Sequence, residues 1–147
     1  MSVQRAERVT EIDASRETCF EVLLDFDAYP EWQPALKTAT VHERDGDGRG
    51  SLVEFSADAV VKQITYTVRY HYDVPARMWW ELVEGTVKSG DGEFALETLG
   101  APDRTRATYR LESDLGFYVP GPLLRKGTEK LMDGVVAGLK REAEKRA

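Results

Sequence analysis

The chain has 147 residues, of which 41% are hydrophobic and 31% are charged, and its formal net charge is −6. These values predict one soluble globular domain over residues 1–147, large enough for a single core. The acidic balance argues against a general nucleic-acid-binding protein. Cys19 is the only cysteine, which excludes an internal disulfide. Together with the absence of an apolar leader segment, the lone cysteine predicts a cytoplasmic protein.

The charge is unevenly distributed along the chain. Residues 120–147 contain seven Lys or Arg and four Asp or Glu, a balance of +3, which leaves −9 for residues 1–119. A solvated helix face is one explanation of this basic end, and transient contact with an anionic membrane surface or a partner is the other. No apolar run reaches the roughly 18 residues of a membrane span, so we expect no integral membrane segment.

The first predicted elements are a strand and a short helix. Residues 3–12 are typical of a strand, although charged residues blur their alternation. Ser15 is expected to be the N-cap of a helix, whose apolar residues recur at helical spacing as far as Leu24. Pro30 and Pro34 limit the next segment to a second helical turn or a bend.

From residue 36 to residue 112 the apolar pattern has a period of two, which is typical of strands. Turn signals separate these runs at residues 45–48, 74–76, 89–92 and 100–103. Because short connections join antiparallel neighbours, we expect about six strands in a meander. With the first strand, the sheet has about seven strands, and helices on one of its faces make the fold class α+β.

A long amphipathic helix is predicted after the Pro-Gly-Pro stop at residues 120–122, from Leu123 to about Arg141. Three glycines fall on one edge of its apolar stripe: Gly127, Gly134 and Gly138. Each glycine inside a helix costs about 1 kcal/mol relative to alanine, so we expect this edge to have a use. Either the helix contacts the sheet closely there, or the smooth strip leaves room for a ligand.

Two motifs resemble the opening of a known family: DASRET at residues 13–18 and DFDAYPEWQP at residues 25–34. They are similar to the polyketide cyclase/dehydrase and lipid-transport proteins of the START-like (SRPBCC, helix-grip) superfamily. Residues 80–85, 92–96 and 105–109 look like the middle strands of that family, and residues 120–144 look like its closing helix. The resemblance spans nearly the whole chain, but its motifs are mostly structural and point to no single activity.

The resemblance implies a helix-grip fold, in which a curved antiparallel sheet wraps around a long C-terminal helix and two short helices follow strand 1. It also implies a deep cavity between the sheet and that helix. Such a cavity typically holds a sterol, lipid, quinone, polyketide or other aromatic compound. The enzymes of the family are cyclases and aromatases, whereas many other members only bind or carry their ligand.

Alternation assigns seven aromatic residues to the concave face of the sheet: Phe55, Tyr66, Tyr70, Tyr72, Trp80, Phe94 and Tyr109. They either fill the core or surround an apolar space in which tyrosine hydroxyls orient a carbonyl or a phenol. With the neighbours that share this face, the entrance and the helix, the candidate ligand-binding residues are Trp32, Phe55, Tyr66, Val68, Tyr70, Tyr72, Trp80, Leu82, Phe94, Tyr109, Phe117, Gly127, Leu131, Gly134 and Val135.

The entrance of the implied cavity is assigned to two segments. Trp32 is expected to pack its bend against the sheet rim, and that bend resembles one wall of the family's cavity entrance. Across the mouth, residues 115–120 form an apolar loop with Phe117 and Tyr118. Exposure of these two rings predicts a portal or a membrane-touching lip, and simple packing is the alternative.

Residues able to perform chemistry are few. His42 and His71 lie far apart, and His71 has the opposite parity to its tyrosine neighbours, so it is expected to face solvent and we expect no metal site. No Gly-rich phosphate loop or nucleophile motif is present, and we expect no cofactor. For proton transfer, parity offers Tyr66, Tyr70, Tyr109 and Glu84 as candidates.

The sequence therefore predicts a protein that binds a hydrophobic small molecule, such as a lipid, quinone or polyketide-like compound, as a carrier or binding protein. A polyketide cyclase, aromatase or dehydratase that uses cavity tyrosines is an alternative. A structural or partner-binding module with a filled core is another. The sequence leaves the ligand, the pathway and the oligomeric state open.

Overall fold

The computed structural model of the protein describes residues 3–59, 61–101 and 103–147. Its strands are β1 (Val3–Ile12), β2 (Leu36–Arg44), β3 (Gly50–Ala59), β4 (Lys62–Asp73), β5 (Arg77–Gly85), β6 (Ser89–Thr98) and β7 (Thr105–Asp114). Its helices are α1 (Arg16–Leu24), α2 (Tyr29–Trp32) and α3 (Gly121–Arg146), and a 3₁₀ helix, η1 (Phe26–Ala28), lies between α1 and α2.

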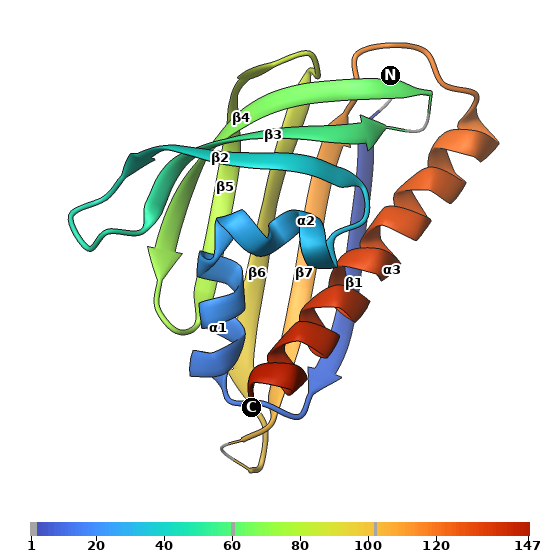
Figure 1. The fold of residues 1–147 in the computed structure, drawn as a ribbon. Helices are drawn as coiled ribbons and strands as arrows, with labels where there is room; N and C mark the ends of the chain where they lie inside the picture. The colour runs from blue at the N-terminus through green and yellow to red at the C-terminus, as the bar shows by residue number, and fades with distance from the viewer. Residues whose placement is uncertain (1–2, 60, 102) are drawn as a thin grey trace.

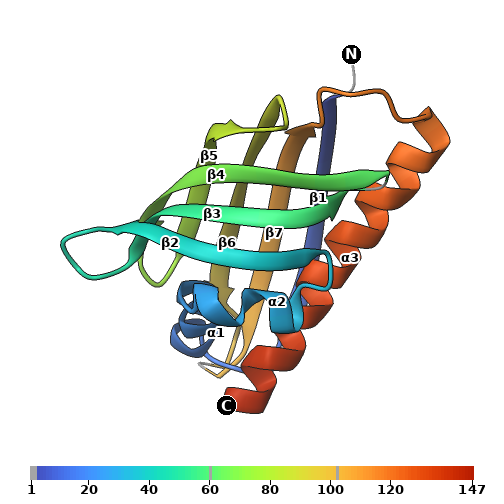
Figure 2. The same ribbon diagram turned by 45° about the horizontal axis from the view of Figure 1, so that its top comes forward.

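The strands form one seven-stranded antiparallel sheet in the order β1-β7-β6-β5-β4-β3-β2. Strands that follow one another from β2 to β7 are neighbours, and β1 is added at the free edge of β7. The sheet is strongly curved, and α3 runs diagonally along its open side, with α1 and α2 beside the C-terminal part of α3 (Figures 1 and 2). This arrangement confirms the predicted helix-grip fold with two short helices after the first strand.

The first helices form where the sequence places them. Ser15 is the N-cap of α1, and its side-chain oxygen accepts a hydrogen bond of 3.2 Å from the backbone N–H of Thr18. The helix buries Phe20, Val22 and Leu23 against the sheet side of the molecule. Pro30 stands in the first turn of α2, where its missing N–H costs no helical hydrogen bond.

Of the predicted turns, those at residues 45–48 and 74–76 join the expected strands, β2 to β3 and β4 to β5. The prediction of a turn at residues 89–92 is wrong, because these residues begin β6 and the chain turns at residues 86–88. Gly92 has a packing role instead, since a Cβ there would overlap the ring of Trp80. The turn predicted at 100–103 falls between β6 and β7, and its Pro102 lies outside the described residues.

Helix α3 is longer than predicted at both ends. Pro122 lies at the start of the helix, where proline is tolerated, so the Pro-Gly-Pro segment begins the helix rather than preceding it. At the other end, the helix continues to Arg146 because its last turns are bonded to the rest of the protein. Among residues 3–59, 61–101 and 103–147, no helix combines the length and apolarity needed to cross a membrane.

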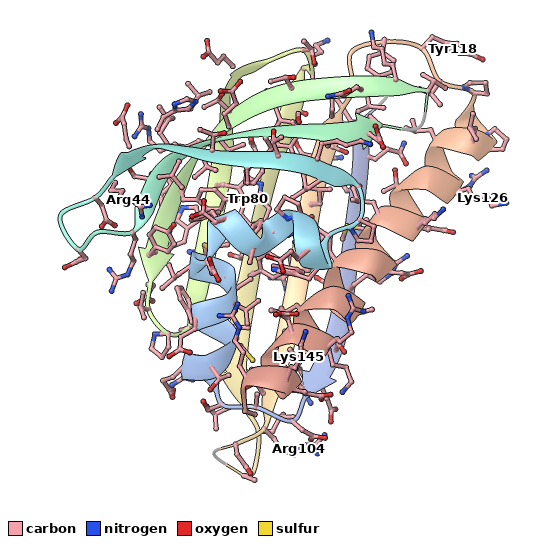
Figure 3. All side chains as sticks on the ribbon, viewed as in Figure 1. Arg44, Trp80, Arg104, Tyr118, Lys126 and Lys145 are labelled. Atoms are coloured by element: carbon pink, nitrogen blue, oxygen red, sulfur yellow. The ribbon has the colours of Figure 1, made fainter. Side chains whose placement is uncertain are left out.

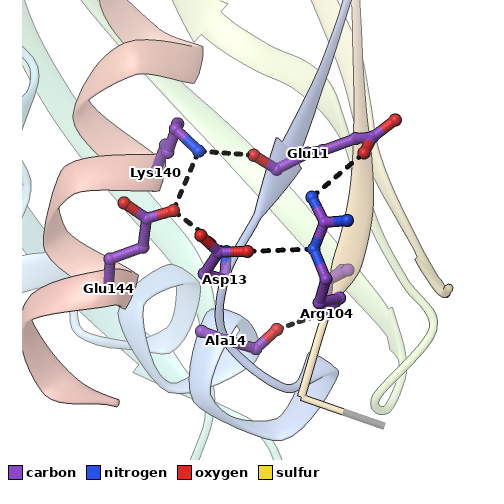
Figure 4. Close-up of polar contacts among 7 residues, drawn as sticks. Glu11, Asp13, Ala14, Arg104, Lys140 and Glu144 are labelled. Atoms are coloured by element: carbon purple, nitrogen blue, oxygen red, sulfur yellow. Dashed lines mark hydrogen bonds and ion pairs between the residues drawn. The ribbon is translucent and has the colours of Figure 1, made fainter. Parts of the chain in front are cut away.

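A polar network fixes the C-terminal half of α3 to the end of β1 (Figure 4). The Lys140 ammonium donates to the Glu11 carbonyl at 2.7 Å and to the Glu144 carboxylate at 2.8 Å. The same carboxylate accepts from the backbone N–H of Asp13 at 2.9 Å. Because this half is also packed through the buried Leu139 and Ala143, it anchors the helix and sets the position of the N-terminal half.

Candidate functional site

A pocket of about 550 Å³ lies between the concave face of the sheet and the N-terminal half of α3. Its walls come from strands β2 to β7, from α3, from Tyr29 of α2 and from residues 33–35, which connect α2 to β2. Most of the predicted ligand-binding residues line it: Phe55, Tyr66, Val68, Tyr70, Trp80, Phe94, Tyr109, Gly127, Leu131, Gly134 and Val135. The pocket is therefore a space that the aromatic face surrounds without filling.

The aromatic rings of the pocket pack against one another around this space. Phe94 and Tyr109 are stacked with centroids 4.7 Å apart, and Trp80 lies 5.7 Å from Phe94. On the facing strands, Phe55 and Tyr66 have centroids 5.5 Å apart. In Figure 3 the Trp80 side chain lies inside the curved sheet. Rings held by their neighbours give the pocket a defined shape.

Trp32 and Tyr72 do not line the pocket, although both were predicted ligand-binding residues. Trp32 is completely buried at the end of α2, beside Tyr29 and the backbone of Gly138. Tyr72 is on the pocket's strand β4 but near its far end, and its hydroxyl donates to the Gly50 carbonyl. Both rings are therefore part of the packed end of the molecule.

Leu82 and Phe117 also lie outside the pocket lining. Leu82 is half-buried on β5, at the irregularity discussed next, and packs against the core. Phe117 is half-buried in the loop between β7 and α3, where the Lys62 ammonium lies 4.0 Å from its ring centroid. The loop therefore lies next to the β3–β4 connection.

The parity count that put Glu84 on the concave face is wrong. A β-bulge interrupts the pairing of β4 with β5, so that Val68 pairs with Leu82 but Thr67 pairs with Glu84. Tyr66 lines the pocket, so the side chain of the next residue, Thr67, lies on the convex face of the sheet. Glu84 is paired with Thr67 and shares that face, and its side chain is exposed. An added residue in one strand reverses every later side chain, which a period-two count does not detect.

Six polar residues of the pocket lining were missed by sequence reasoning: Gln33, Asp58, Ser89, Ser113, Thr128 and Lys130. Ser89 was assigned to a turn because of the glycines that follow it. Its hydroxyl oxygen is buried without a hydrogen-bond partner in the described part of the chain. Ser113 shares the parity of Tyr109, so extending the alternation of β7 by one step beyond Leu111 finds it.

The tyrosine hydroxyls fall into two groups. Tyr29 donates to the Leu23 carbonyl at 2.6 Å, and Tyr72 is bonded as described above. The hydroxyls of Tyr66, Tyr70 and Tyr109 have no hydrogen-bond partner within residues 3–59, 61–101 and 103–147. None of the three hydroxyl oxygens is among the described polar atoms that are fully buried without a partner, so each is accessible from the pocket and free to bond a molecule there.

Burial keeps these phenols protonated. It raises the pKa of Tyr66 to about 12, and it raises the pKa of Tyr70 and of Tyr109 above the ordinary tyrosine value. For Tyr70 and Tyr109, the neighbouring tyrosines act in the same direction as burial. All three side chains are therefore neutral hydrogen-bond donors near neutral pH and are poor bases.

Ionisable groups other than tyrosine are confined to the rim of the described pocket lining. They are Asp58 and Lys130, both of which are exposed. His42 and His71 lie on the outer surface, paired with Glu54 at 2.7 Å and Glu81 at 2.9 Å, as the parity of His71 predicts. No group of three or more potential metal ligands occurs among the described residues.

The glycine edge of α3 divides into two parts. Gly134 lines the pocket, and a Cβ built on it would meet nothing within 4 Å. Gly138 is one turn further on, and a Cβ there would overlap the carbonyl oxygen of Trp32. Both predicted uses of the edge therefore occur at different glycines, and the close contact is with α2 rather than with the sheet.

Comparison with known proteins places the chain in one family. Residues 3–144 match the family described as "Polyketide cyclase / dehydrase and lipid transport". No curated protein sequence matches the chain. Solved structures do match, and those most similar share the architecture described above at low sequence identity.

A START superfamily protein from Mycobacterium smegmatis is 24% identical, with a TM-score of 0.85 over 97% of this chain and 99% of its own. The ZhuI aromatase/cyclase from Streptomyces sp. R1128 is 20% identical, with a TM-score of 0.82 over 98% and 95% of the two chains. The major latex-like protein 151 of Panax ginseng is 14% identical, with a TM-score of 0.69 over 97% and 99%. The TM-scores establish a shared fold. Because the family match covers residues 3–144, the chain belongs to the polyketide cyclase/dehydrase and lipid-transport family.

Proposed function

We propose that the protein binds a hydrophobic, ring-containing small molecule that carries a carbonyl or phenol oxygen, and that it acts as a binding or carrier protein. The observation that carries this proposal is the set of partnerless hydroxyls of Tyr66, Tyr70 and Tyr109 in an apolar pocket. Each hydroxyl can donate to an oxygen acceptor on a bound ligand, and such a hydrogen bond contributes about 0.5–1.5 kcal/mol. A pure hydrocarbon gains no such contribution, so the pocket favours ligands that carry oxygen.

The dimensions and lining of the pocket support a ligand of several fused rings. Its volume of about 550 Å³ is within the usual range of small-molecule sites. Flat rings gain from stacking on aromatic walls such as Trp80 and Phe94. The open surface above Gly134 adds a side-chain-free strip along which a ring system can lie.

A matched pair of ligands tests the proposal. Anthraquinone and anthracene have the same three fused rings, and only anthraquinone has carbonyl oxygens. We expect both to bind, as measured by quenching of tryptophan fluorescence. Combined substitution of Tyr66, Tyr70 and Tyr109 by Phe should weaken anthraquinone binding about tenfold, since a neutral hydrogen bond contributes about 0.5–1.5 kcal/mol. Anthracene binding should be unchanged.

Two results would contradict the proposal. Failure of both compounds to bind, together with no co-purifying molecule in native mass spectra, would leave the pocket without a ligand-binding role. An equal loss of both affinities in the triple variant would mean that the tyrosines shape the pocket and do not recognise oxygen. Tyr29→Phe, which alters a hydroxyl already bonded to Leu23, is the matched control and should preserve the selectivity.

An enzymatic role is the second candidate, and the neutral pocket tyrosines favour it specifically. Each is a possible proton donor to a carbonyl or leaving hydroxyl in the cyclisation or dehydration of a polyketide-like substrate. The fold is shared with a protein described as an aromatase/cyclase. Binding is placed first because the described pocket offers no buried base, as Asp58 is exposed at the rim. Turnover of a poly-β-ketone that disappears in the triple Phe variant, with anthracene binding retained, would establish catalysis.

A further inference from the structure

Three connections meet at the end of the fold where the pocket reaches the surface. They are the β3–β4 connection, the β5–β6 turn at residues 86–88 and the loop at residues 115–120 (Figure 1). The Lys62 ammonium contacts the Phe117 ring, and the backbone N–H of Lys88 donates to the Asp114 carbonyl at 2.8 Å. Residues of all three connections or their adjoining strands line the pocket. We call this end of the molecule the pocket rim.

Large apolar side chains stand exposed on the rim. Tyr118 is 81% exposed at the outer side of its loop, where Figure 3 shows it pointing away from the body of the protein. Val61 is 55% exposed beside the β3–β4 connection, and Leu123 is 44% exposed in the first turn of α3. These three side chains contribute little to the core. They lie around the pocket and are free to contact another molecule.

Cations without ion pairs surround these apolar side chains. Five basic residues lie on the rim: Lys62, Lys88, Arg125, Lys126 and Lys130. None of them forms an ion pair with any described residue. Four acids lie among or beside them: Glu84, Asp114, Glu129 and Asp58. The Asp114 carboxylate accepts from the Gly116 backbone N–H at 2.9 Å, and Asp58 is paired with a sixth basic residue, Lys37, at 3.4 Å. The rim is therefore locally basic on a protein whose net charge is −6.

The two ends of α3 differ in this respect. At the C-terminal end, Lys140 is paired with Glu144 at 2.8 Å, and Arg146 with Asp25 at 3.1 Å. At the N-terminal end, Arg125 and Lys126 are exposed, and Lys126 points outward from the helix in Figure 3. Among the described residues, three basic residues in the N-terminal half of α3 lack an ion pair (Arg125, Lys126 and Lys130), against one, Arg141, in the C-terminal half. Unpaired cations are therefore more numerous at the rim end of the helix.

We propose that the pocket rim docks on the surface of an anionic lipid bilayer. Tyr118, Leu123 and Val61 enter the headgroup region, and the surrounding Lys and Arg side chains contact lipid phosphates. Four of the five unpaired cations that the structure describes on the rim are lysines, which are depleted at protein–protein interfaces but common on membrane-docking surfaces, so a bilayer is favoured over an acidic protein. The proposal rests on the proposed function, since docking in this orientation lets an apolar ligand pass between bilayer and pocket without crossing water.

Co-flotation with lipid vesicles tests this orientation. The full chain is mixed with vesicles of phosphatidylcholine, with or without phosphatidylglycerol, and the bound fraction is measured. We expect binding only to the phosphatidylglycerol vesicles, weakening as salt is raised. Each Lys or Arg near such a surface contributes about a fivefold change in affinity, so Arg125→Glu with Lys126→Glu should reduce binding at least about 25-fold. Tyr118→Ser with Leu123→Ser should also release the protein.

Matched controls separate the rim from general charge. Arg141→Glu with Lys145→Glu makes the same charge change at the other end of α3 and should bind vesicles like the wild type. Val9→Ser removes a side chain that is 53% exposed on β1, away from the rim, and should have no effect. None of the four substituted rim residues lines the pocket, so all variants should bind anthraquinone normally.

The outcomes distinguish the two proposals. Absence of binding to phosphatidylglycerol vesicles, or an equal loss in the rim and control charge variants, would overturn the docking surface while anthraquinone binding stands. Binding to a small acidic protein with no binding to vesicles would also overturn it. Failure of the wild-type protein to bind anthraquinone or anthracene would instead contradict the proposed function, whatever the result with vesicles.

Discussion

At the scale of single residues, Gly134 and Gly138 show that the same residue type one turn apart serves different purposes. Gly134 faces the open pocket, so its missing side chain contributes volume. Gly138 has no side chain, and this allows the backbone of Trp32 to pack directly against the backbone of α3. The sequence places both on one helix edge but contains no information on what lies opposite each of them.

Substitution by alanine should separate these roles. Gly134→Ala gains helix propensity without a clash and should raise the free energy of unfolding by about 0.5–1 kcal/mol. Gly138→Ala should lower it by about 1–3 kcal/mol, because the new methyl group overlaps a backbone oxygen that cannot rotate away. Urea unfolding of the two variants measures both effects. Changes of the same sign would contradict the assignment of the two glycines.

The raised pKa values of the pocket tyrosines predict a loss of stability in alkali. The Tyr66 phenol ionises near pH 10 in the unfolded chain but near pH 12 in the folded protein. The folded state therefore holds the proton more tightly, and this contribution is complete below pH 10 and is lost as the pH rises towards 12. We expect unfolding free energy, followed by circular dichroism in urea, to fall over this window.

The triple Tyr66, Tyr70 and Tyr109→Phe variant should lose much of that alkaline dependence. Because these hydroxyls have no partner in the described structure, their removal should not lower stability at pH 7. Tyr118→Phe changes an exposed tyrosine and is expected to unfold at the same pH as the wild type. An unchanged alkaline profile in the triple variant would mean that its tyrosines are not the groups that titrate.

At the scale of elements, α3 consists of an anchored half and a half that covers the pocket. The polar network of Figure 4 holds the anchored half on β1, and Glu144 is its central acceptor. Hydrogen bonds from the Asp13 backbone N–H and from Lys140 lower the pKa of Glu144. Its contribution to stability is therefore present above the unfolded carboxyl pKa of about 4.3 and is lost as the pH falls further.

Glu144→Gln should loosen the last turns of the helix. We expect faster amide hydrogen exchange after Leu139 and a loss of at most about 1 kcal/mol, since the network is partly exposed to solvent. Glu142→Gln is the matched control, because within the part of the chain that the structure describes Glu142 pairs only with Lys145 and Arg146 on the same helix. Equal changes in the two variants would mean that the contact with β1 does not anchor α3.

The order and type of these elements follow from local sequence signals, whereas irregularities inside the strands do not. Ser15, the two prolines of the α2 segment and the period of two identify the elements because each acts on its own neighbourhood. The bulge opposite Thr67 depends on pairing between two strands, and it moved Glu84 out of the pocket. The misplaced turn at Ser89 has the same origin, since Gly92 accommodates a ring from another strand.

At the scale of the whole molecule, the pocket depends on a contrast between two ends of the fold. The end with α1, α2 and the C-terminal half of α3 is closed by fully buried side chains such as Trp32, Leu23 and Leu139. The other end keeps space between the sheet and α3. Alternation predicted which face of the sheet is apolar, but the volume left between two apolar faces depends on how closely they approach. That distance is fixed by contacts remote in sequence, such as the one between Gly138 and Trp32.

The pairing of β1 with β7 has a consequence for synthesis on the ribosome. Val3 is opposite Asp114 and Ile12 is opposite Thr105, so the first strand to be made waits for the last one before it can pair. Contacts so distant in sequence form slowly. Until then the aromatic face of β3 to β6 has no α3 over it and remains open to other chains. The growing polypeptide therefore exposes the aromatic wall of its pocket before α3 can cover it, and this interval is when aggregation is most favoured.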